Sequence, residues 1–220
     1  EASSVDQLPG ALLGAGIAVG VTVGVGKSGA IQRLVLVGVA VSALCSALTS
    51  IFLVIDEAQL ATVMSWLSGR LAGVRLDDII PALIAVLVVV PLTLVGAKTL
   101  DLLVAGDAVA GAVGAKPERT RLAAIVAAVV LIAPAVAATG PIGFLGLMAA
   151  AVAWRVCGPH HRMGLCVAGV VGAAVLLVAD SVGQTIWAPA ETPVGIVTSL
   201  AGMPLVLWSV HALGRRKHVA

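Results

Sequence analysis

Residues 180–207 read Asp-Ser-Val-Gly-Gln-Thr-Ile-Trp-Ala-Pro-Ala-Glu-Thr-Pro-Val-Gly-Ile-Val-Thr-Ser-Leu-Ala-Gly-Met-Pro-Leu-Val-Leu. Two apolar runs meet in this stretch at a polar hinge that contains Glu191 and Pro193. The runs extend outward to residues 165–187 and 194–213. Each is near the roughly 20 residues that a helix needs to cross the hydrocarbon core of a bilayer. The stretch therefore predicts two membrane-spanning helices joined by a short polar loop.

The composition of the whole chain also indicates a membrane protein. Of its 220 residues, 60% are hydrophobic and 11% are charged, and the mean hydropathy is +1.13. A soluble domain of this size could not bury so much apolar surface, so lipid must be the solvent. The net charge is only +2, and we expect no nucleic-acid partner. Small residues at four-residue spacing predict close helix packing at Gly10/Gly14, Gly16/Gly20/Gly24 and Gly169/Ala173.

Seven apolar runs have close to the spanning length, and a helix satisfies its own backbone hydrogen bonds in lipid. We therefore expect an all-α polytopic bundle that forms one transmembrane domain over residues 1–220. The predicted spans are residues 8–26, 34–55, 79–96, 122–138, 142–156, 165–187 and 194–213. The fifth is short, which is compatible with a partly re-entrant segment. Residues 56–78 are too polar to cross and predict short helices at the extracytoplasmic surface.

The cations divide unequally between the two sides of the predicted bundle. One side holds only Arg70 and Arg75, together with most of the acidic residues. The opposite side holds eleven cations, which are Lys27, Arg33, Lys98, Lys116, Arg119, Arg121, Arg155, Arg162, Arg215, Arg216 and Lys217. The positive-inside rule places this richer side in the cytoplasm. The C-terminus is then inside and the N-terminus outside.

The hinge and the last predicted span carry five residues in a specific order, namely Glu191, Pro193, Gly195, Gly202 and Pro204. This order resembles the C-terminal signature of the FecCD-type permeases, the membrane subunits of ABC importers for iron-siderophores, haem and cobalamin. The resemblance implies a bacterial plasma membrane, a cytoplasmic ATPase subunit, an extracytoplasmic substrate-binding protein and a second copy or homologous permease. The family usually has ten spans, and the seven here resemble its last seven. We therefore expect an N-terminally incomplete permease domain.

Residues 140–147 read Gly-Pro-Ile-Gly-Phe-Leu-Gly-Leu and resemble the family's Gly-Pro-Ile-Gly-Phe-Val-Gly-Leu. Pro141 is expected to start a helix, and Gly143 and Gly146 to let neighbouring backbones approach. The family has Pro-His where this chain has Ala150-Ala151, which leaves the helix geometry and gating there open. The resemblance implies structural or gating roles for Gly140, Pro141, Gly143, Gly146, Asp180, Pro193, Gly195, Gly202 and Pro204.

Residues 98–121 form the largest predicted cytoplasmic loop, which is unusually apolar. Its pattern predicts a short helix that ends at Gly114, with Pro117 beyond as a stop, and with one side lined by Leu102, Leu103, Val109 and Val113. An interfacial helix without a partner would show the same pattern. The loop also resembles the family's Leu-Gly-Asp-x-x-Ala-x-x-Leu-Gly coupling helix, which inserts into a cleft of the ATPase. The matching residues are Gly106, Asp107, Ala110, Val113 and Gly114.

Arg70 and Arg75 have a plain explanation, because interfacial arginines commonly reach to lipid headgroups. In the resembling family, however, the binding protein docks on the outer face partly through acidic–basic pairs. Arg70, Arg75 and Glu191 are therefore candidate docking residues. Asp180 lies within an apolar span, where an unpaired carboxylate is costly. We expect it to be a structural anchor.

Other motifs do not support catalysis or a bound cofactor. The spacing of Cys157, His160, His161 and Cys166 differs from standard zinc sites, so we expect no metal. The sequence from Gly24 to Ser28 lacks the first glycine of a phosphate-binding loop. No nucleophile–base pair or paired carboxylates occur in a plausible cleft, so we expect no enzyme activity.

The expected function is the membrane-spanning permease subunit of an ATP-driven importer for an iron-siderophore or a related metal chelate. ATP hydrolysis would take place on the separate ATPase subunit. One alternative is a secondary transporter or channel, which only Asp180 supports. Another is a non-transporting truncated permease, which the missing first spans and Ala150-Ala151 support.

Overall fold

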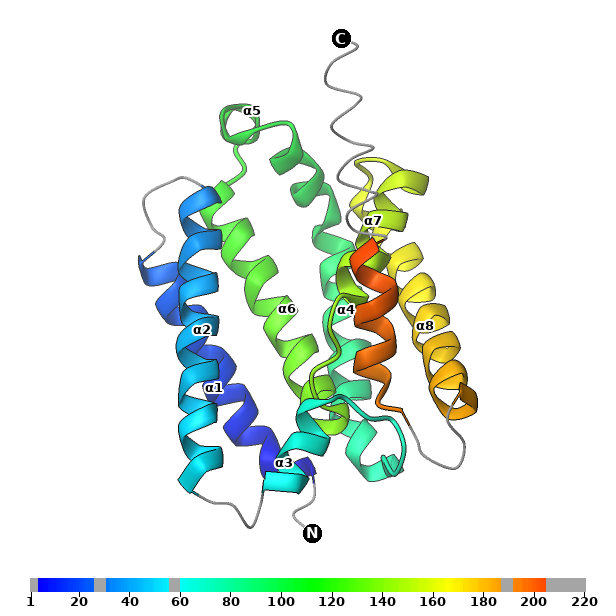
Figure 1. The fold of residues 1–220 in the computed structure, drawn as a ribbon. Helices are drawn as coiled ribbons and strands as arrows, with labels where there is room; N and C mark the ends of the chain where they lie inside the picture. The colour runs from blue at the N-terminus through cyan, green and yellow to red at the C-terminus, as the bar shows by residue number, and fades with distance from the viewer. Residues whose placement is uncertain (1–3, 26–30, 56–59, 187–191, 205–220) are drawn as a thin grey trace.

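The computed structural model describes residues 4–25, 31–55, 60–186 and 192–204, and within them the chain is helical (Figure 1). The labelled helices are α1 (Ser4–Val25), α2 (Ile31–Ile55), α3 (Leu60–Leu67), α4 (Leu76–Val104), α5 (Asp107–Ala112), α6 (Pro117–Thr139), α7 (Leu145–Cys157) and α8 (His161–Ile186). A further apolar helix, Val194–Pro204, follows α8, and we refer to it as the final helix. The expectation of an all-α bundle is confirmed.

In the part of the chain that the structure describes, four helices are long and apolar enough to cross a membrane, namely Val35–Ile55 within α2, and α4, α6 and α8. Three shorter apolar helices are Pro9–Gly24 within α1, α7 and the final helix. Each predicted span therefore overlaps an apolar helix, although residues 26, 187 and 205–213 of the predicted spans lie outside the described residues. The 13 residues of α7 extend only about 20 Å, less than the thickness of the hydrocarbon core.

The start of α7 differs from the prediction. Pro141 does not begin the helix, because residues 141–144 are non-helical and α7 starts at Leu145. Phe144 precedes the helix with a left-handed φ of 62°, a conformation uncommon for any residue except glycine. From Leu145 the helix continues unbroken through Ala150 and Ala151 to Cys157. The absence of the family's Pro-His therefore leaves a regular α7.

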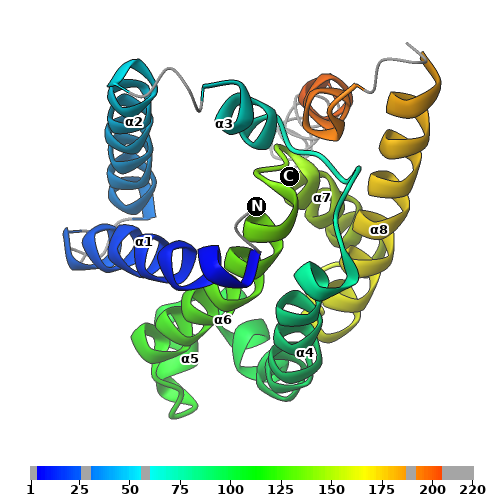
Figure 2. The ribbon, with the colours of Figure 1, turned by 90° about the horizontal axis from the view of Figure 1, so that it is seen from below.

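The helices pack in a defined set of neighbours. Helices α7 and α8 lie along one another, α4 packs against both α6 and α8, and α1 packs against α6. Figure 2 shows α2 at one corner of the bundle, where it adjoins α1 and α3. No side chain of α2 from Val35 to Ile55 is buried. Most of its apolar surface is therefore exposed, as expected for an element solvated by lipid or by another membrane protein.

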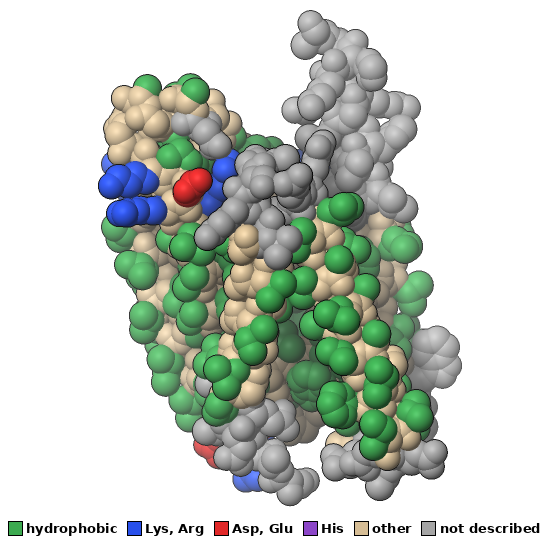
Figure 3. All heavy atoms as spheres, turned by 90° about the vertical axis from the view of Figure 1, so that its left-hand side faces the viewer, with side chains coloured by type: hydrophobic (Ala, Val, Ile, Leu, Met, Phe, Trp, Pro, Cys, Tyr) green, Lys and Arg blue, Asp and Glu red, His purple; other side chains and the backbone are tan. Residues whose placement is uncertain are grey.

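Buried side chains are mostly small. Among the described residues, eight of the buried side chains are alanines, and they are Ala85, Ala97, Ala110, Ala133, Ala137, Ala149, Ala153 and Ala179. Large apolar side chains point outward instead, and Figure 3 shows them over the middle of one side of the molecule. Charged side chains appear there toward its two ends. This arrangement is the reverse of a soluble protein and agrees with burial in a bilayer.

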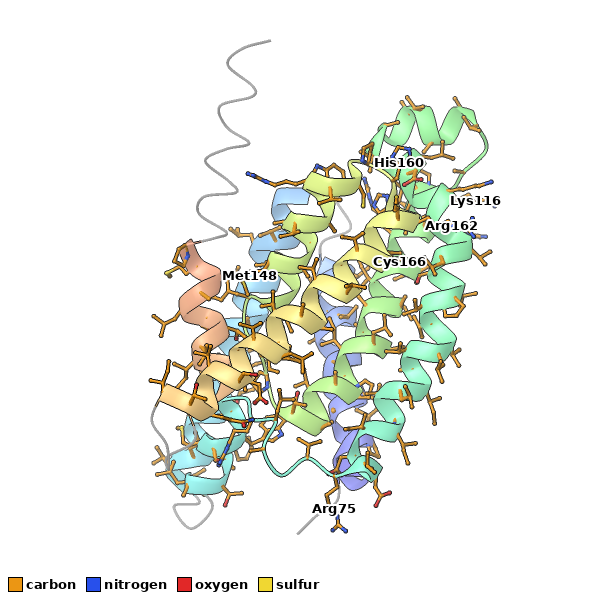
Figure 4. All side chains as sticks on the ribbon, turned by 90° about the vertical axis from the view of Figure 1, so that its right-hand side faces the viewer. Arg75, Lys116, Met148, His160, Arg162 and Cys166 are labelled. Carbon is orange, nitrogen blue, oxygen red and sulfur yellow. The ribbon has the colours of Figure 1, made fainter. Side chains whose placement is uncertain are left out.

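The two ends of the bundle carry different charged residues. Lys116, His160 and Arg162 lie at one end, and Arg75 lies at the opposite end (Figure 4). Helix α5 lies at the same end as Lys116 (Figure 1). We call these the basic end and the Arg75 end. The predicted division of cations between two faces is thus reproduced by these residues.

The predicted close packing at the glycine repeats is wrong. A side-chain carbon added at Gly10, Gly14, Gly16, Gly20, Gly24 or Gly169 would meet no heavy atom of a neighbouring helix within 4 Å. Gly16, Gly20 and Gly24 instead line an open apolar groove of about 440 Å³ between α1 and α6. Four-residue spacing allows a close approach between helices, but it does not require one.

The alanine contacts can be tested at Ala97, which has no exposed surface on α4. Ala97→Leu would add three carbons to a filled site, which typically costs about 1–3 kcal/mol. We expect a lower midpoint of thermal unfolding in detergent. Val95→Leu is the matched control, because Val95 on the same helix is 82% exposed. Equal midpoints for the two variants would contradict the packing described here.

Candidate coupling segment and glycine junction

The end of α4 and the start of α5 are separated by a sharp break at Gly106. Helix α4 continues to Val104, and Gly106 then adopts a φ of 109°. This backbone conformation is open to glycine and strained for other residues. The expectation of one short helix carrying Leu102, Leu103, Val109 and Val113 on one side is therefore wrong. Leu102 and Leu103 belong to α4, and α5 is a separate helix of six residues.

The end of α5 is a glycine cap. Gly114 has a φ of 83°, and the backbone N–H of Ala115 donates to the carbonyl of Ala110 at 3.0 Å. In a Schellman motif, this is the hydrogen bond that spans six residues at the C-terminal end of the helix. Pro117 is the first residue of α6, where its missing N–H and fixed φ suit the first turn. We call Gly106–Gly114 the α5 segment.

The α5 segment brings four predicted coupling residues together, namely Gly106, Ala110, Val113 and Gly114. Ala110 is fully buried, whereas Val113 is 67% exposed and Val109 is 48% exposed. The side chain of Asp107 lies outside the described part of the chain. The α5 segment thus has one buried side chain, that of Ala110, and two exposed apolar side chains, those of Val109 and Val113.

A polar contact at the basic end was not predicted from the sequence. Oδ1 of Asp101 on α4 accepts the backbone N–H of His161 at 2.8 Å and lies 2.7 Å from the Nδ1 of that histidine. The ring of Trp154 on α7 meets the His161 ring edge-on, with centroids 6.4 Å apart. Asp101 and His161 are separated by 60 positions, so no local pattern could pair them. The described residues contain no cluster of His, Cys, Asp and Glu that could hold a metal ion.

At the Arg75 end, three backbone segments approach one another closely, and a glycine lies at each point of contact. The backbone N–H of Gly195 donates to the carbonyl of Gly69 at 3.3 Å, and a Cβ at Gly195 would overlap the carbonyl oxygen of Ser68. A Cβ at Gly140 would overlap the carbonyl of Trp66, and one at Gly69 would lie 2.7 Å from the carbonyl of Pro141. We call Gly69, Gly140 and Gly195 the glycine junction. Larger residues would push these backbones apart.

The final helix continues this close approach along α7. A Cβ at Gly202 would lie 2.5 Å from the Cβ of Phe144, and one at Gly143 would lie 3.0 Å from Oγ of Ser199. Gly146 has no such neighbour within 4 Å among the described residues, so its role stays a prediction. Of the signature residues, Pro193 precedes the final helix, and Pro204 is its exposed last described residue.

Two residues of this junction were missed by the sequence analysis. Thr198 is fully buried, and its hydroxyl donates to the carbonyl of Gly195 at 3.1 Å. Gly183 on α8 accepts the backbone N–H of Thr192, and a Cβ on Gly183 would lie 2.9 Å from the Thr192 carbonyl. A lone threonine or glycine in an apolar run gives no signal of such a partner.

The predicted docking residues differ in how far they are buried. Arg70 is half-buried, donates its backbone N–H to Thr139 at 2.9 Å and donates from Nη1 to Oγ of Ser65 at 2.9 Å. Arg75 is exposed at the start of α4, and its backbone N–H donates to Asp78. Glu191 lies outside the described residues. Arg70 is thus held by the fold, while Arg75 projects from it.

Asp180 lies near the Arg75 end of α8. Its Oδ2 accepts a hydrogen bond from Nε2 of Gln184, one turn later on the same helix, at 2.8 Å. Asp180 and Arg70 also line the same small pocket beside the residues that lead into the final helix. The hydrogen bond from Gln184 links Asp180 to its own helix, and its role as an anchor stays a prediction.

A model of the FecCD transport family matches residues 1–212. The chain belongs to the FecCD transport family. The earlier resemblance is thereby confirmed over nearly the whole chain.

Curated FecCD relatives include proteins for different cargoes. The chain is 37% identical over 183 residues to the hemin transport system permease protein HmuU of Yersinia pestis. It is 37% identical over 177 residues to the iron(3+)-hydroxamate import system permease protein FhuG of Bacillus subtilis (strain 168). These matches cover 83% and 80% of this chain, but 55% and 53% of the relatives. The chain thus spans about half the length of the curated relatives it matches.

The fold is also similar to a solved structure described as an inward-facing conformation of a metal-chelate type ABC transporter. The superposition has a TM-score of 0.85 at 29% sequence identity. It covers 96% of this chain and 68% of the other. The helix arrangement described above is therefore that of an ABC transporter membrane domain.

The glycine junction of this FecCD chain can be tested at Gly140, which has φ 74° and ψ 177°. This region of backbone space is almost exclusive to glycine, and forcing another residue into it costs on the order of 1–3 kcal/mol. We expect Gly140→Ala to lower the midpoint of thermal unfolding in detergent. Gly146→Ala is the matched control, since alanine in an open helical position is neutral or stabilising. An unchanged midpoint for Gly140→Ala would contradict the junction.

Proposed function

We propose that the chain is the membrane-spanning permease subunit of an ATP-driven importer in a bacterial plasma membrane. Its cargo is an iron-siderophore or a related metal chelate such as haem or cobalamin. The observation that carries this proposal is family membership, with permease relatives of hemin, iron-hydroxamate and cobalamin systems. The chain spans about half the length of those relatives.

The α5 segment is proposed to dock into a cleft of a cytoplasmic ATPase subunit. Support comes from its position at the basic end and from the two exposed apolar side chains of Val109 and Val113. Glycines at 106 and 114 allow the tight turns on either side. ATP hydrolysis on the partner would move this segment, and this chain would hydrolyse nothing itself.

The Arg75 end is proposed to meet an extracytoplasmic substrate-binding protein. Arg75 is exposed and suited to pair with an acidic residue of that partner, and Arg70 and Glu191 are the other proposed docking residues. A second permease copy or a homologous permease would complete the pore. The glycine junction and the final helix, with Asp180, Pro193 and Pro204, are proposed to act in gating.

The α5 segment proposal predicts that Val113→Asp abolishes uptake. An apolar anchor buried in a partner pocket commonly contributes about 2 kcal/mol or more, so a charge there should weaken ATPase binding at least tenfold. The measurement is ATP-dependent uptake of radiolabelled iron(III)–desferrioxamine, haem and cobalamin by membranes containing the chain.

Val156→Asp is the matched control for this experiment. Val156 is 70% exposed near the end of α7 and lies outside the α5 segment. The proposal expects uptake to survive this change. Loss of uptake in both variants to the same degree would indicate general damage and contradict a specific role for Val113.

The proposed orientation puts the basic end in the cytoplasm and the C-terminus inside. A chain with its three cysteines replaced by serine is the background for labelling. We expect a membrane-impermeant maleimide to label Arg75→Cys in intact protoplasts, and Lys116→Cys only after the membrane is permeabilised. Both positions are exposed, so access to the reagent decides the result. The opposite labelling pattern would reverse the orientation.

A further inference from the structure

We infer that the contact between Asp101 and His161 transmits movement of the α5 segment to α7 and α8, which makes Asp101 a positioning residue of the transport cycle. This inference rests on the proposed function. It adds a residue pair, on two different helices, that none of the family motifs described above contains.

The first step is the double contact made by one carboxylate oxygen. Oδ1 of Asp101 accepts the backbone N–H of His161 at 2.8 Å and contacts the ring Nδ1 at 2.7 Å. Because α8 begins at His161, this oxygen satisfies a backbone donor that has no partner within the helix. The negative carboxylate also faces the positive end of the α8 dipole. The start of α8 is therefore fixed to α4 by backbone as well as side chain.

The second step is the short distance along the chain to the α5 segment. Asp101 lies in the last turn of α4, and Gly106 follows only five positions later. The backbone N–H groups of Ala105 and Gly106 donate to the carbonyls of Leu102 and Leu103, which keeps this link compact. A displacement of the α5 segment would consequently reach Asp101 through a hydrogen-bonded stretch of backbone.

The third step is the connection from His161 to the far end of the bundle. The His161 ring meets the edge of Trp154, so the same contact includes α7. At the Arg75 end, Gly183 of α8 is hydrogen-bonded to Thr192, just before the final helix. Met148 of α7, and Phe144 just before that helix, lie next to Gly202 of the final helix. Helices α7 and α8 thus join the basic end to the helix that carries the family signature.

A helix cap that only stabilises the fold would show the same hydrogen bonds. The two roles differ in one measurable quantity, the amount of chelate transported per ATP hydrolysed. A stabilising cap affects the amount of folded complex, whereas a transmitting contact affects this ratio at equal amounts of complex. The ratio therefore separates the two.

The experiment uses the full transporter, purified with its ATPase and binding protein and reconstituted in proteoliposomes. The probe is whichever of radiolabelled iron(III)–desferrioxamine, haem or cobalamin the native chain imports. Asp101→Ala removes both contacts, Asp101→Asn keeps a neutral acceptor, and His161→Ala keeps only the backbone donor. Glu118→Ala is the control, because Glu118 is an exposed carboxylate in the first turn of α6 at the same end.

We expect Asp101→Ala to lower the transported chelate per ATP at least about fivefold, the lower end of typical coupling between linked sites. Bound ATPase and its rate of ATP hydrolysis should stay close to native. His161→Ala and Asp101→Asn should give smaller losses, and Glu118→Ala none. If Asp101→Ala does not assemble, His161→Ala and Asp101→Asn decide the question.

Native ratios in all three Asp101 and His161 variants would overturn the inference and leave the proposed function intact. A loss of ATPase binding in proportion to the loss of transport would likewise overturn it, since the contact would then serve assembly alone. A native complex that shows no ATP-dependent transport would instead contradict the proposed function itself.

Discussion

The close approach of three backbones at the glycine junction is the constraint on which the Arg75 end depends. Gly69, Gly140 and Gly195 sit where side chains would overlap the carbonyl oxygens of neighbouring segments. Because an apolar bundle in lipid gains little from a hydrophobic effect between helices, close packing and hydrogen bonds must hold its elements together. The hydrogen bond from Gly195 to Gly69 and that from Arg70 to Thr139 form at this point. They join the final helix and the segment after α3 to the end of α6.

The basic end is built differently, from caps and turns. Gly106 and Gly114 set the α5 segment apart from α4 and α6, and Asp101 holds the start of α8. The proposed route between the two ends runs through α7 and α8, which pack against one another. Under the proposed function, a packed pair of helices between the α5 segment and the glycine junction suits a permease that changes which side of a pore is open. Under the proposed function, motion driven by ATP would start at α5 and would end where the final helix meets the glycine junction.

Much of this arrangement could be predicted from the sequence, and the failures have physical causes. Apolar run length determined the helices, because lipid leaves the backbone few alternatives. The division of cations between two ends followed from loop charge. Spacing alone could not tell that Gly16 lines an open groove while Gly140 touches Trp66, since both depend on where a partner helix lies. The left-handed Phe144 and the Asp101–His161 contact likewise depend on tertiary structure, which a single sequence does not reveal.

The most direct test of the central claim is purification of the unaltered chain from its native membrane in mild detergent, followed by measurement of the mass and subunit composition of the complex. The account predicts an ABC-type ATPase in stoichiometric amount, together with further permease helices on a second chain or on the same polypeptide. A folded chain that purifies reproducibly without any ATPase would contradict the account and favour a secondary transporter or a non-transporting permease.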